Sequence, residues 1–197
     1  TNKNAIIMEV LLNIDNYEEW VCNDNLDFSE VEKDEIKKKV GLDHVKKVEY
    51  VNIGPGADWI VILLLLDLGL QLIKVGAEIN DGIDGWIGLG KKLHKLFYRN
   101  KIVSIDNDGA TALAINLIAK KEKIDRLEKM QESTINLADS SGFIRENKGL
   151  SNKPHNYYIQ TYCINNNDVY MIGVKSTGKA EIIKHFCYDL NGLVEIK

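Results

Sequence analysis

Arginine is scarce in this sequence. Only three of the 25 basic residues are arginines, namely Arg99, Arg126 and Arg145. Arginine is the side chain that reads guanine edges and binds phosphate groups through two parallel hydrogen bonds. The shortage therefore disfavours sequence-specific recognition of nucleic acid.

Cysteines are also few, and no leader segment is visible. Cys22, Cys163 and Cys187 are odd in number and far apart, in a chain long enough to bury a core without disulfides. Residues 1–4 run straight into a strand-like segment and lack the charged, apolar and small-residue regions of a signal peptide. These absences predict a reduced, soluble and cytoplasmic protein.

No apolar run is long enough to cross a membrane as a helix. The longest is residues 59–73, WIVILLLLDLGLQLI, which Asp67 and Gln71 interrupt. As a helix it would reach about 22 Å, short of the roughly 30 Å hydrocarbon core. Because its apolar residues would lie nearly all around the axis, it predicts a helix over residues 58–77 that is buried in the core.

The remaining composition is that of an ordinary globular domain. Hydrophobic residues make up 45% and charged residues 27% of the 197 positions, and neither repeats nor low-complexity tracts occur. We expect a single domain over residues 1–197. A subdivision into a mixed α/β part, 1–137, and an antiparallel β part, 155–197, is the alternative.

Charge is distributed unevenly along the chain. Residues 1–54 contain 7 basic and 12 acidic side chains, and residues 55–90 contain 1 and 5. Residues 91–153 reverse the balance with 13 and 8, and residues 154–197 contain 4 of each. Oppositely charged parts of one domain could attract each other. The sharper interpretation is a localised basic face for an acidic partner.

Local patterns predict an α+β fold that begins with a strand, a helix and a second strand. The strands cover residues 5–14 and 45–53. Ser29 and Glu32 have the spacing of a capping box, and Gly41 suits the end of a helix over 29–40.

The centre of the chain predicts two further helices, and the tail predicts strands. Apolar residues at helical spacing indicate an amphipathic helix over 86–101 and a long helix from 110 to about 132, separated by a strand at 102–105. A loop is expected over 138–156. Segments 157–164, 169–176, 181–190 and 193–197 predict an antiparallel meander of three to four strands.

The amphipathic helix is the most basic segment of the chain. Residues 91–101 contain five cations and no acid, and Lys91, Lys92, Lys95 and Arg99 lie mostly away from the apolar positions. Basic amphipathic helices bind acidic proteins, anionic membranes or nucleic-acid backbones, and they also simply cover cores with a solvated face. Among the binding functions, an acidic protein partner is favoured because arginine is scarce.

Asp106-Asn107-Asp108-Gly109 follows the strand at 102–105 directly. This sequence resembles the first motif of haloacid-dehalogenase-like phosphohydrolases. The resemblance implies that one carboxylate attacks a phosphoryl group and that both bind Mg²⁺. The resemblance covers about five residues, Ala110 replaces the usual Thr, and no later paired-aspartate segment follows. Capping of the next helix by Asp106 and Asp108 is therefore the favoured interpretation.

Two other patterns are incomplete. Residues 85–92 have the glycine and lysine spacing of a phosphate-binding loop, but Lys92 replaces the Ser or Thr that would bind Mg²⁺, so a glycine-bearing helix start is favoured. His155, Cys163, His185 and Cys187 could form a zinc set or a Cys-His nucleophile pair. Their spacing matches no common zinc module, and buried cysteine usually acts as a small hydrophobe.

The preferred functional hypothesis is a non-enzymatic protein–protein interaction or regulatory module that needs no cofactor. The first alternative is a Mg-dependent phosphate-ester hydrolase, in which Asp106 and Asp108 bind the metal and Asp81, Asp84 or His155 adds a ligand. In that case His155 and His185 are further catalytic candidates. The second alternative is a membrane-active effector, in which residues 59–79 insert and the helix at 86–101 lies on the headgroups. Oligomeric state stays open.

Overall fold

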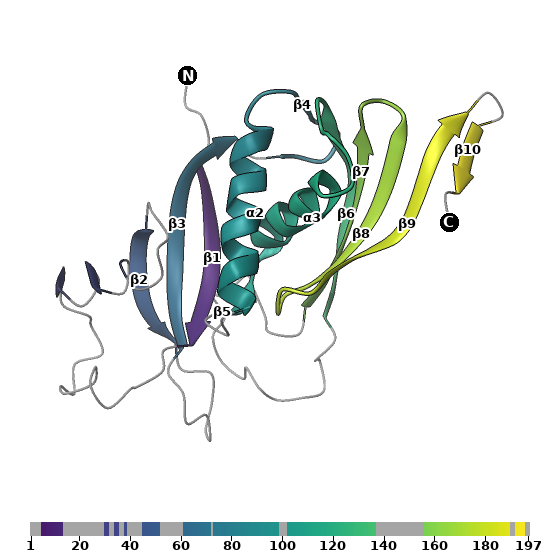
Figure 1. Cartoon of the computed structure of the whole chain (residues 1–197). Coiled ribbons are helices and arrows are strands. Elements are labelled where there is room, and N and C mark those ends of the chain that lie inside the picture. Colours follow the sequence, from purple (N-terminus) through teal and green to yellow (C-terminus); the bar gives the residue numbers. More distant parts are fainter. Residues whose placement is uncertain are drawn as a thin grey trace.

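The computed structural model of the chain describes residues 5–13, 30–31, 34–35, 38, 45–51, 61–71, 73–98, 102–136, 156–189 and 192–195. Within these residues, two antiparallel sheets flank a layer of two helices (Figure 1). This arrangement confirms the predicted α+β class. No helix among the described residues combines the length and apolar character needed to cross a membrane.

The first sheet contains four strands in the order β2-β3-β1-β5. The strands are β1 (Ala5–Asn13), β2 (Val45–Val51), β3 (Val61–Gln71) and β5 (Ile102–Ile105). All neighbours are antiparallel, and Leu64 of β3 is opposite Val10 on one side and Val48 on the other. The three predicted strands in this part of the chain are confirmed.

The predicted buried helix over residues 58–77 is wrong, because residues 61–71 form strand β3. A continuous apolar run has no periodicity, so a buried helix and a central strand look alike in the sequence. Strands β1 and β2 pair with both edges of β3, which satisfies its backbone hydrogen bonds without a helix. The segment that would insert in the membrane-active alternative, residues 59–79, therefore contains a strand where a helix was predicted.

The first central helix is α2 (Ile83–Tyr98), which confirms the predicted amphipathic helix. Its apolar residues form a buried stripe that includes Trp86, Leu89, Leu93 and Leu96. The spacing that resembles a phosphate-binding loop, residues 85–92, lies inside this helix, so no loop is present to enclose a phosphate.

The second central helix is α3 (Asn107–Ala119), and it lies between the two sheets. Nine of its residues are buried, on all sides of the axis, so α3 has the central position that the sequence assigned to residues 58–77. The prediction that this helix continues to residue 132 is wrong. Helix α3 ends at Ala119, and strand β6 (Leu127–Asn136) begins eight residues later and pairs with the following strand over most of its length.

The second sheet has the order β10-β9-β8-β7-β6-β4. Strand β4 (Glu78–Ile79) is short, and the others are β7 (Asn156–Ile164), β8 (Asp168–Lys175), β9 (Ala180–Asp189) and β10 (Gly192–Glu195). This sheet confirms the predicted C-terminal meander. Asn165 and Asn166 both have positive φ in the turn from β7 to β8, a conformation that Asn tolerates better than most residues.

Helices α2 and α3 pack closely because Gly90 has no side chain. A Cβ atom at Gly90 would lie 2.6 Å from the Cβ atom of Asn116 and would also meet the carbonyl oxygen of Ala112. The surrounding core combines side chains of α2, α3 and both sheets, from Met8 of β1 to Tyr158 of β7. The helices therefore join the two sheets through one continuous set of apolar contacts.

Two sequence predictions fall largely outside the described residues. Of the predicted helix over 29–40, only residues 30, 31, 34, 35 and 38 are described, and these are helical. The predicted loop over 138–156 lies outside the described part except for Asn156, which begins β7.

Candidate functional site

Asp106 caps helix α3 and ties it to strand β1. Its backbone is extended, and its side chain is 7% exposed. Oδ1 accepts a hydrogen bond from the Gly109 N–H at 2.9 Å, and Oδ2 accepts one from the Glu9 N–H at 2.6 Å. Each oxygen therefore accepts one backbone hydrogen bond, an arrangement typical of a side chain that caps a helix.

The same carboxyl group has an unusual pKa. Burial raises the pKa of Asp106 to about 7, with a smaller contribution from the negative charge of Asp108, while the backbone hydrogen bonds from Glu9 and Gly109 oppose the rise. Burial also raises the pKa of Asp108, against the attraction of the Lys129 ammonium. The two acids at this helix start therefore differ from solvated carboxylates.

A buried lysine lies beside this helix start. Lys129 of β6 is 1% exposed, forms an ion pair with Glu132, and donates a hydrogen bond to the Thr111 hydroxyl at 3.1 Å. The same ammonium is close enough to attract the Asp108 carboxylate, and its positive charge opposes a second cation there. This cation adds to the case for a structural role of the cluster.

The buried side chain of Gln160 extends the network to strand β7 of the second sheet. Its Nε2 donates to Asn107 Oδ1 at 2.9 Å and to Thr111 Oγ1 at 3.0 Å, and its Oε1 accepts from the Tyr162 hydroxyl at 2.8 Å. Tyr158 completes the contact between β7 and the helix start, because its hydroxyl donates to the carbonyl of Ile105 at 3.0 Å. These satisfied polar groups fix α3 against the sheet.

The other predicted Mg²⁺ ligands lie elsewhere. Asp81 and Asp84 line a cavity beside Ala119 at the far end of α3, whereas Asp106 lies at its start. A helix of 13 residues is about 20 Å long, so these acids are not brought to Asp106. His155 lies outside the described residues.

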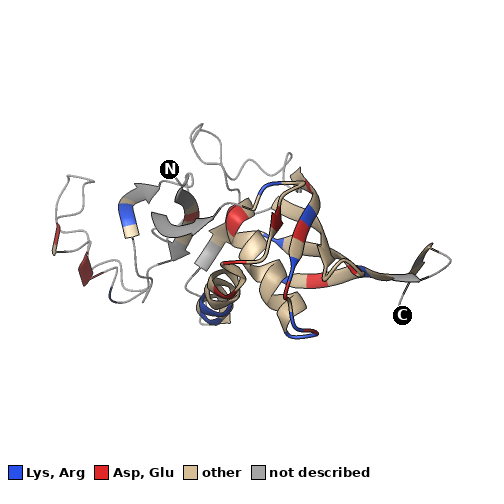
Figure 2. Ribbon diagram, turned by 90° about the horizontal axis from the view of Figure 1, so that it is seen from above, with Lys and Arg blue, Asp and Glu red and all other residues tan. Residues whose placement is uncertain are grey.

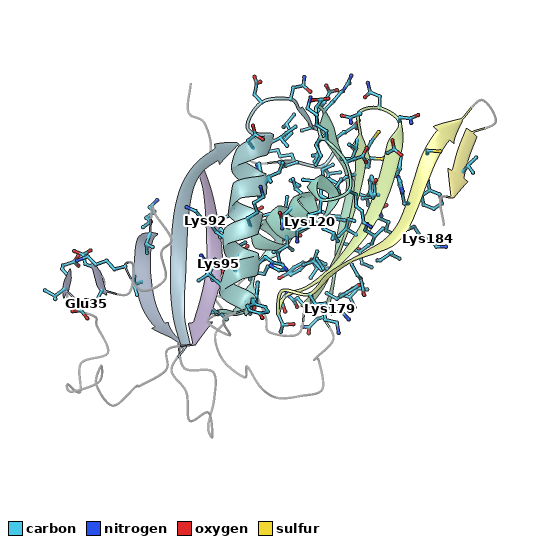
Figure 3. All side chains as sticks on the ribbon, in the orientation of Figure 1. Glu35, Lys92, Lys95, Lys120, Lys179 and Lys184 are labelled. Carbon is cyan, nitrogen blue, oxygen red and sulfur yellow. The ribbon has the colours of Figure 1, made fainter. Side chains whose placement is uncertain are left out.

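Lysines cover the outer side of α2. Lys91, Lys92 and Lys95 are exposed, on the side of the helix opposite its buried stripe, and Arg99 lies outside the described residues. Exposed lysines also occur in the turn that connects α3 to β6, and Figure 2 shows both groups on one side of the molecule. Figure 3 labels two residues of the first group and one of the second. We refer to six residues as the basic face: Lys91, Lys92, Lys95, Lys120, Lys121 and Lys123.

A cavity of about 530 Å³ lies within the basic face, between the start of α2 and the end of α3. Three of these lysines line it, namely Lys91, Lys120 and Lys123. Acidic residues from the start of α2 and from the turn after α3 share its wall: Asp81, Asp84, Glu122 and Asp125. The basic face therefore surrounds a recess of mixed charge.

Two polar atoms without a hydrogen-bond partner in the described part of the chain belong to side chains that line this cavity. They are Oδ1 of Asn116, a residue that is 2% exposed, and Oε1 of Glu122. Buried acceptors without partners are rare in folded proteins, because desolvation of such an atom costs about 1–3 kcal/mol.

A cluster that the sequence did not reveal lies beside this cavity. Glu122, Asp168 and His185 each place one potential ligand atom within 4.8 Å of the other two. His185 Nε2 lies 2.9 Å from Asp168 Oδ1, and its ring stacks on Tyr170 with centroids 4.0 Å apart. Of these residues only His185 was a predicted site residue.

The His and Cys set predicted from the sequence does not assemble among the described residues. His185 and Cys187 share one face of β9, opposite Tyr170 and Asp168 of β8. Cys163 instead pairs with Val169, and alternation along β8 places that pair on the other face. Cys163 and His185 therefore cannot bind one metal ion or act as a nucleophile pair.

Comparison of the chain with protein-family models, with curated proteins and with solved structures finds no match. Function therefore has to be inferred from the side chains themselves. Of the predicted catalytic residues, Asp106 and Asp108 lie together at the start of α3, and His185 lies on β9 in a different cluster.

Proposed function

We propose that this chain is a non-enzymatic interaction module that binds an acidic protein partner through the basic face. The observation that supports this most strongly is the convergence of exposed lysines from two separate segments, α2 and the turn after α3, on one side of the molecule (Figure 2). Each segment alone is an ordinary solvated surface. Together they concentrate positive charge on a protein whose net charge is −4.

The structure of α2 suits this role. Its buried stripe, which includes Trp86 and Leu93, anchors the helix in the core, so the lysines project from a rigid support. A fixed array of charges attracts an opposite surface over about a Debye length, roughly 8–10 Å at physiological salt. The acids of the recess add a pattern of charge that can distinguish one acidic partner from another.

An acidic protein fits this surface better than a nucleic acid does. The basic face contains lysines and no arginine, and Arg126, the one arginine in the described residues, forms an ion pair with Glu78. Recognition of base edges in nucleic acid favours the paired donors of arginine, whereas the lysine ammonium is a point charge that can contact any carboxylate.

The binding test uses a fluorescein-labelled poly-glutamate peptide, because the partner is defined here only by its chemistry. Fluorescence anisotropy in reducing buffer measures the dissociation constant of the unmodified chain and of the variant K91E/K92E/K95E. We expect binding that weakens with salt, and a loss of affinity of about tenfold or more in the variant.

The matched control reverses three exposed lysines outside the basic face, in the variant K46E/K175E/K179E. This control changes the net charge equally and should leave most of the affinity intact. Circular dichroism verifies that both variants are folded. An equal loss of affinity in the two variants would mean that net charge, and not the basic face, determines binding of the peptide. Tighter binding to single-stranded DNA or to anionic vesicles than to the peptide would contradict an acidic protein as the partner.

A further inference from the structure

The cluster of Glu122, Asp168 and His185 joins three separate parts of the chain. Glu122 belongs to the turn between α3 and β6, Asp168 begins β8, and His185 lies in β9. All three side chains are partly buried, and their ligand atoms lie within 4.8 Å of one another. The cluster combines one imidazole with two carboxylates, which is a mixed ligand set and not only an accumulation of acids.

The distances suit a metal ion. Ligand atoms about 2.1 Å from an ion lie about 3.0 Å apart at neighbouring octahedral positions and about 3.4 Å apart at tetrahedral positions. Asp168 Oδ1 and His185 Nε2 are 2.9 Å apart, so one ion could contact both with little movement. The ligand atom of Glu122 lies within 4.8 Å of the other two atoms, so it needs to move by at most an ångström or two to reach the same ion.

Neighbouring groups hold the potential ligands in place. Tyr170 stacks on the His185 ring at an interplanar angle of 11°, and its hydroxyl hydrogen-bonds to the Glu122 carboxylate. Contacts of this kind orient metal ligands in characterised sites. They leave Glu122 Oε1 buried and without a hydrogen-bond partner in the described part of the chain.

The adjoining cavity gives the cluster an entry path. Glu122 lines that cavity, and so does Asn116, whose Oδ1 is also buried and unpartnered. An ion can therefore approach the carboxylate from the recess, and water can occupy the coordination positions that the protein leaves open.

We propose that Glu122, Asp168 and His185 bind one divalent ion of the first transition series, with Zn²⁺ as the probe. Imidazole favours such ions over Mg²⁺ and Ca²⁺, which prefer oxygen ligands alone. The bound ion joins the α3–β6 turn to the meander. Because this turn also contains Lys120, Lys121 and Lys123, the metal fixes one half of the basic face.

The test is calorimetric titration of the chelator-treated chain with Zn²⁺, compared with Mg²⁺. One Zn²⁺ should bind per chain with micromolar or tighter affinity, and Mg²⁺ should bind far more weakly. At about a hundredfold excess over the dissociation constant, Zn²⁺ should raise the melting temperature by about 5–10 °C.

Substitution of each ligand separates this site from adventitious binding. H185Q, D168N and E122Q should each weaken Zn²⁺ binding by about tenfold or more. E122Q lies in the turn and leaves both strands intact, so it remains informative if a strand variant fails to fold. The matched controls are H94Q and D125N, at exposed positions, and they should bind like the unmodified chain.

Y170F tests the orientation of the ligands, because it keeps the stacked ring and removes the hydroxyl. Its affinity should lie between those of the unmodified chain and H185Q. The proposal is overturned if Zn²⁺ binding is not saturable, if the three ligand variants bind as tightly as H94Q, or if Mg²⁺ binds as well as Zn²⁺. None of these outcomes depends on the proposed acidic partner.

Discussion

At the scale of single residues, Asp106 has the most distinctive chemistry in the described part of the chain. It is buried, its pKa is raised to about 7, and its two oxygens accept backbone hydrogen bonds from β1 and from the start of α3. A group of this kind stabilises the fold by capping and destabilises it whenever it must ionise without water.

Asp106 predicts a pH dependence of stability with a definite sign. Between pH about 4 and about 7 the unfolded chain has lost the proton that the folded chain keeps, so its contribution falls as pH rises. Each pKa unit corresponds to about 1.4 kcal/mol, so the contribution is a few kcal/mol at most. Urea unfolding at pH 5 and pH 8 measures it: the advantage of the unmodified chain over D106N should be larger at pH 5.

The comparison between the two chains removes the effects of other titrating groups. D81N, at an exposed position, provides the control and should change little between the two pH values relative to the unmodified chain. An advantage over D106N that is equal at both pH values, or larger at pH 8, would show that the carboxyl ionises freely in the folded state.

At the scale of elements, the contact between α2 and α3 depends on one glycine. A Cβ at Gly90 would lie 2.6 Å from Asn116 Cβ, whereas a Cβ at Gly88, on the same helix, would meet nothing within 4 Å. We expect G90A to lower the free energy of unfolding by about 1–3 kcal/mol through overpacking. G88A should raise it by up to about 1 kcal/mol, because alanine favours helix.

Urea unfolding of the two alanine variants checks this prediction. Both substitutions lie in α2, so G88A is the control for G90A. A G90A variant as stable as G88A would mean that the two helices are farther apart than described.

The elements that sequence reasoning identified are those with local signals. Strand-like runs separated by turn-forming residues predicted the meander strands, and the position of Asp106 directly before a helical segment predicted its cap. Strand β3 was missed because its apolar run has no alternation, and only its pairing with β1 and β2 decides its conformation. A local sequence pattern contains no information about a pairing strand that is distant in the sequence.

The candidate metal cluster could not be predicted from the sequence for a related reason. Glu122 and His185 lie in the turn after α3 and in β9, and only the fold brings them together. The helix predicted to continue to residue 132 also placed Glu122 in mid-helix, whereas in the structure Glu122 belongs to the turn between α3 and β6. The lysines of α2 were predictable, because amphipathic spacing is a local property.

At the scale of the whole molecule, two sheets enclose a layer of two helices (Figure 1). The proposed binding surface, the basic face, lies where this helix layer meets solvent. Helix α3 is almost entirely buried and connects the sheets, whereas α2 presents its lysines to the outside. The chain is acidic overall, with a net charge of −4, so attraction to an acidic partner has to be local. We therefore expect the partner to cover the basic face and no other lysine-bearing surface.

Lysine footprinting tests this claim most directly. The chain is acetylated briefly with acetic anhydride, with and without the poly-glutamate peptide, and mass spectrometry measures modification at each lysine. The peptide should protect Lys91, Lys92 and Lys95 together with the lysines of residues 120–123, and should leave Lys175 and Lys179 unprotected. Equal protection at all exposed lysines, or protection confined to Lys175 and Lys179, would contradict binding through the basic face.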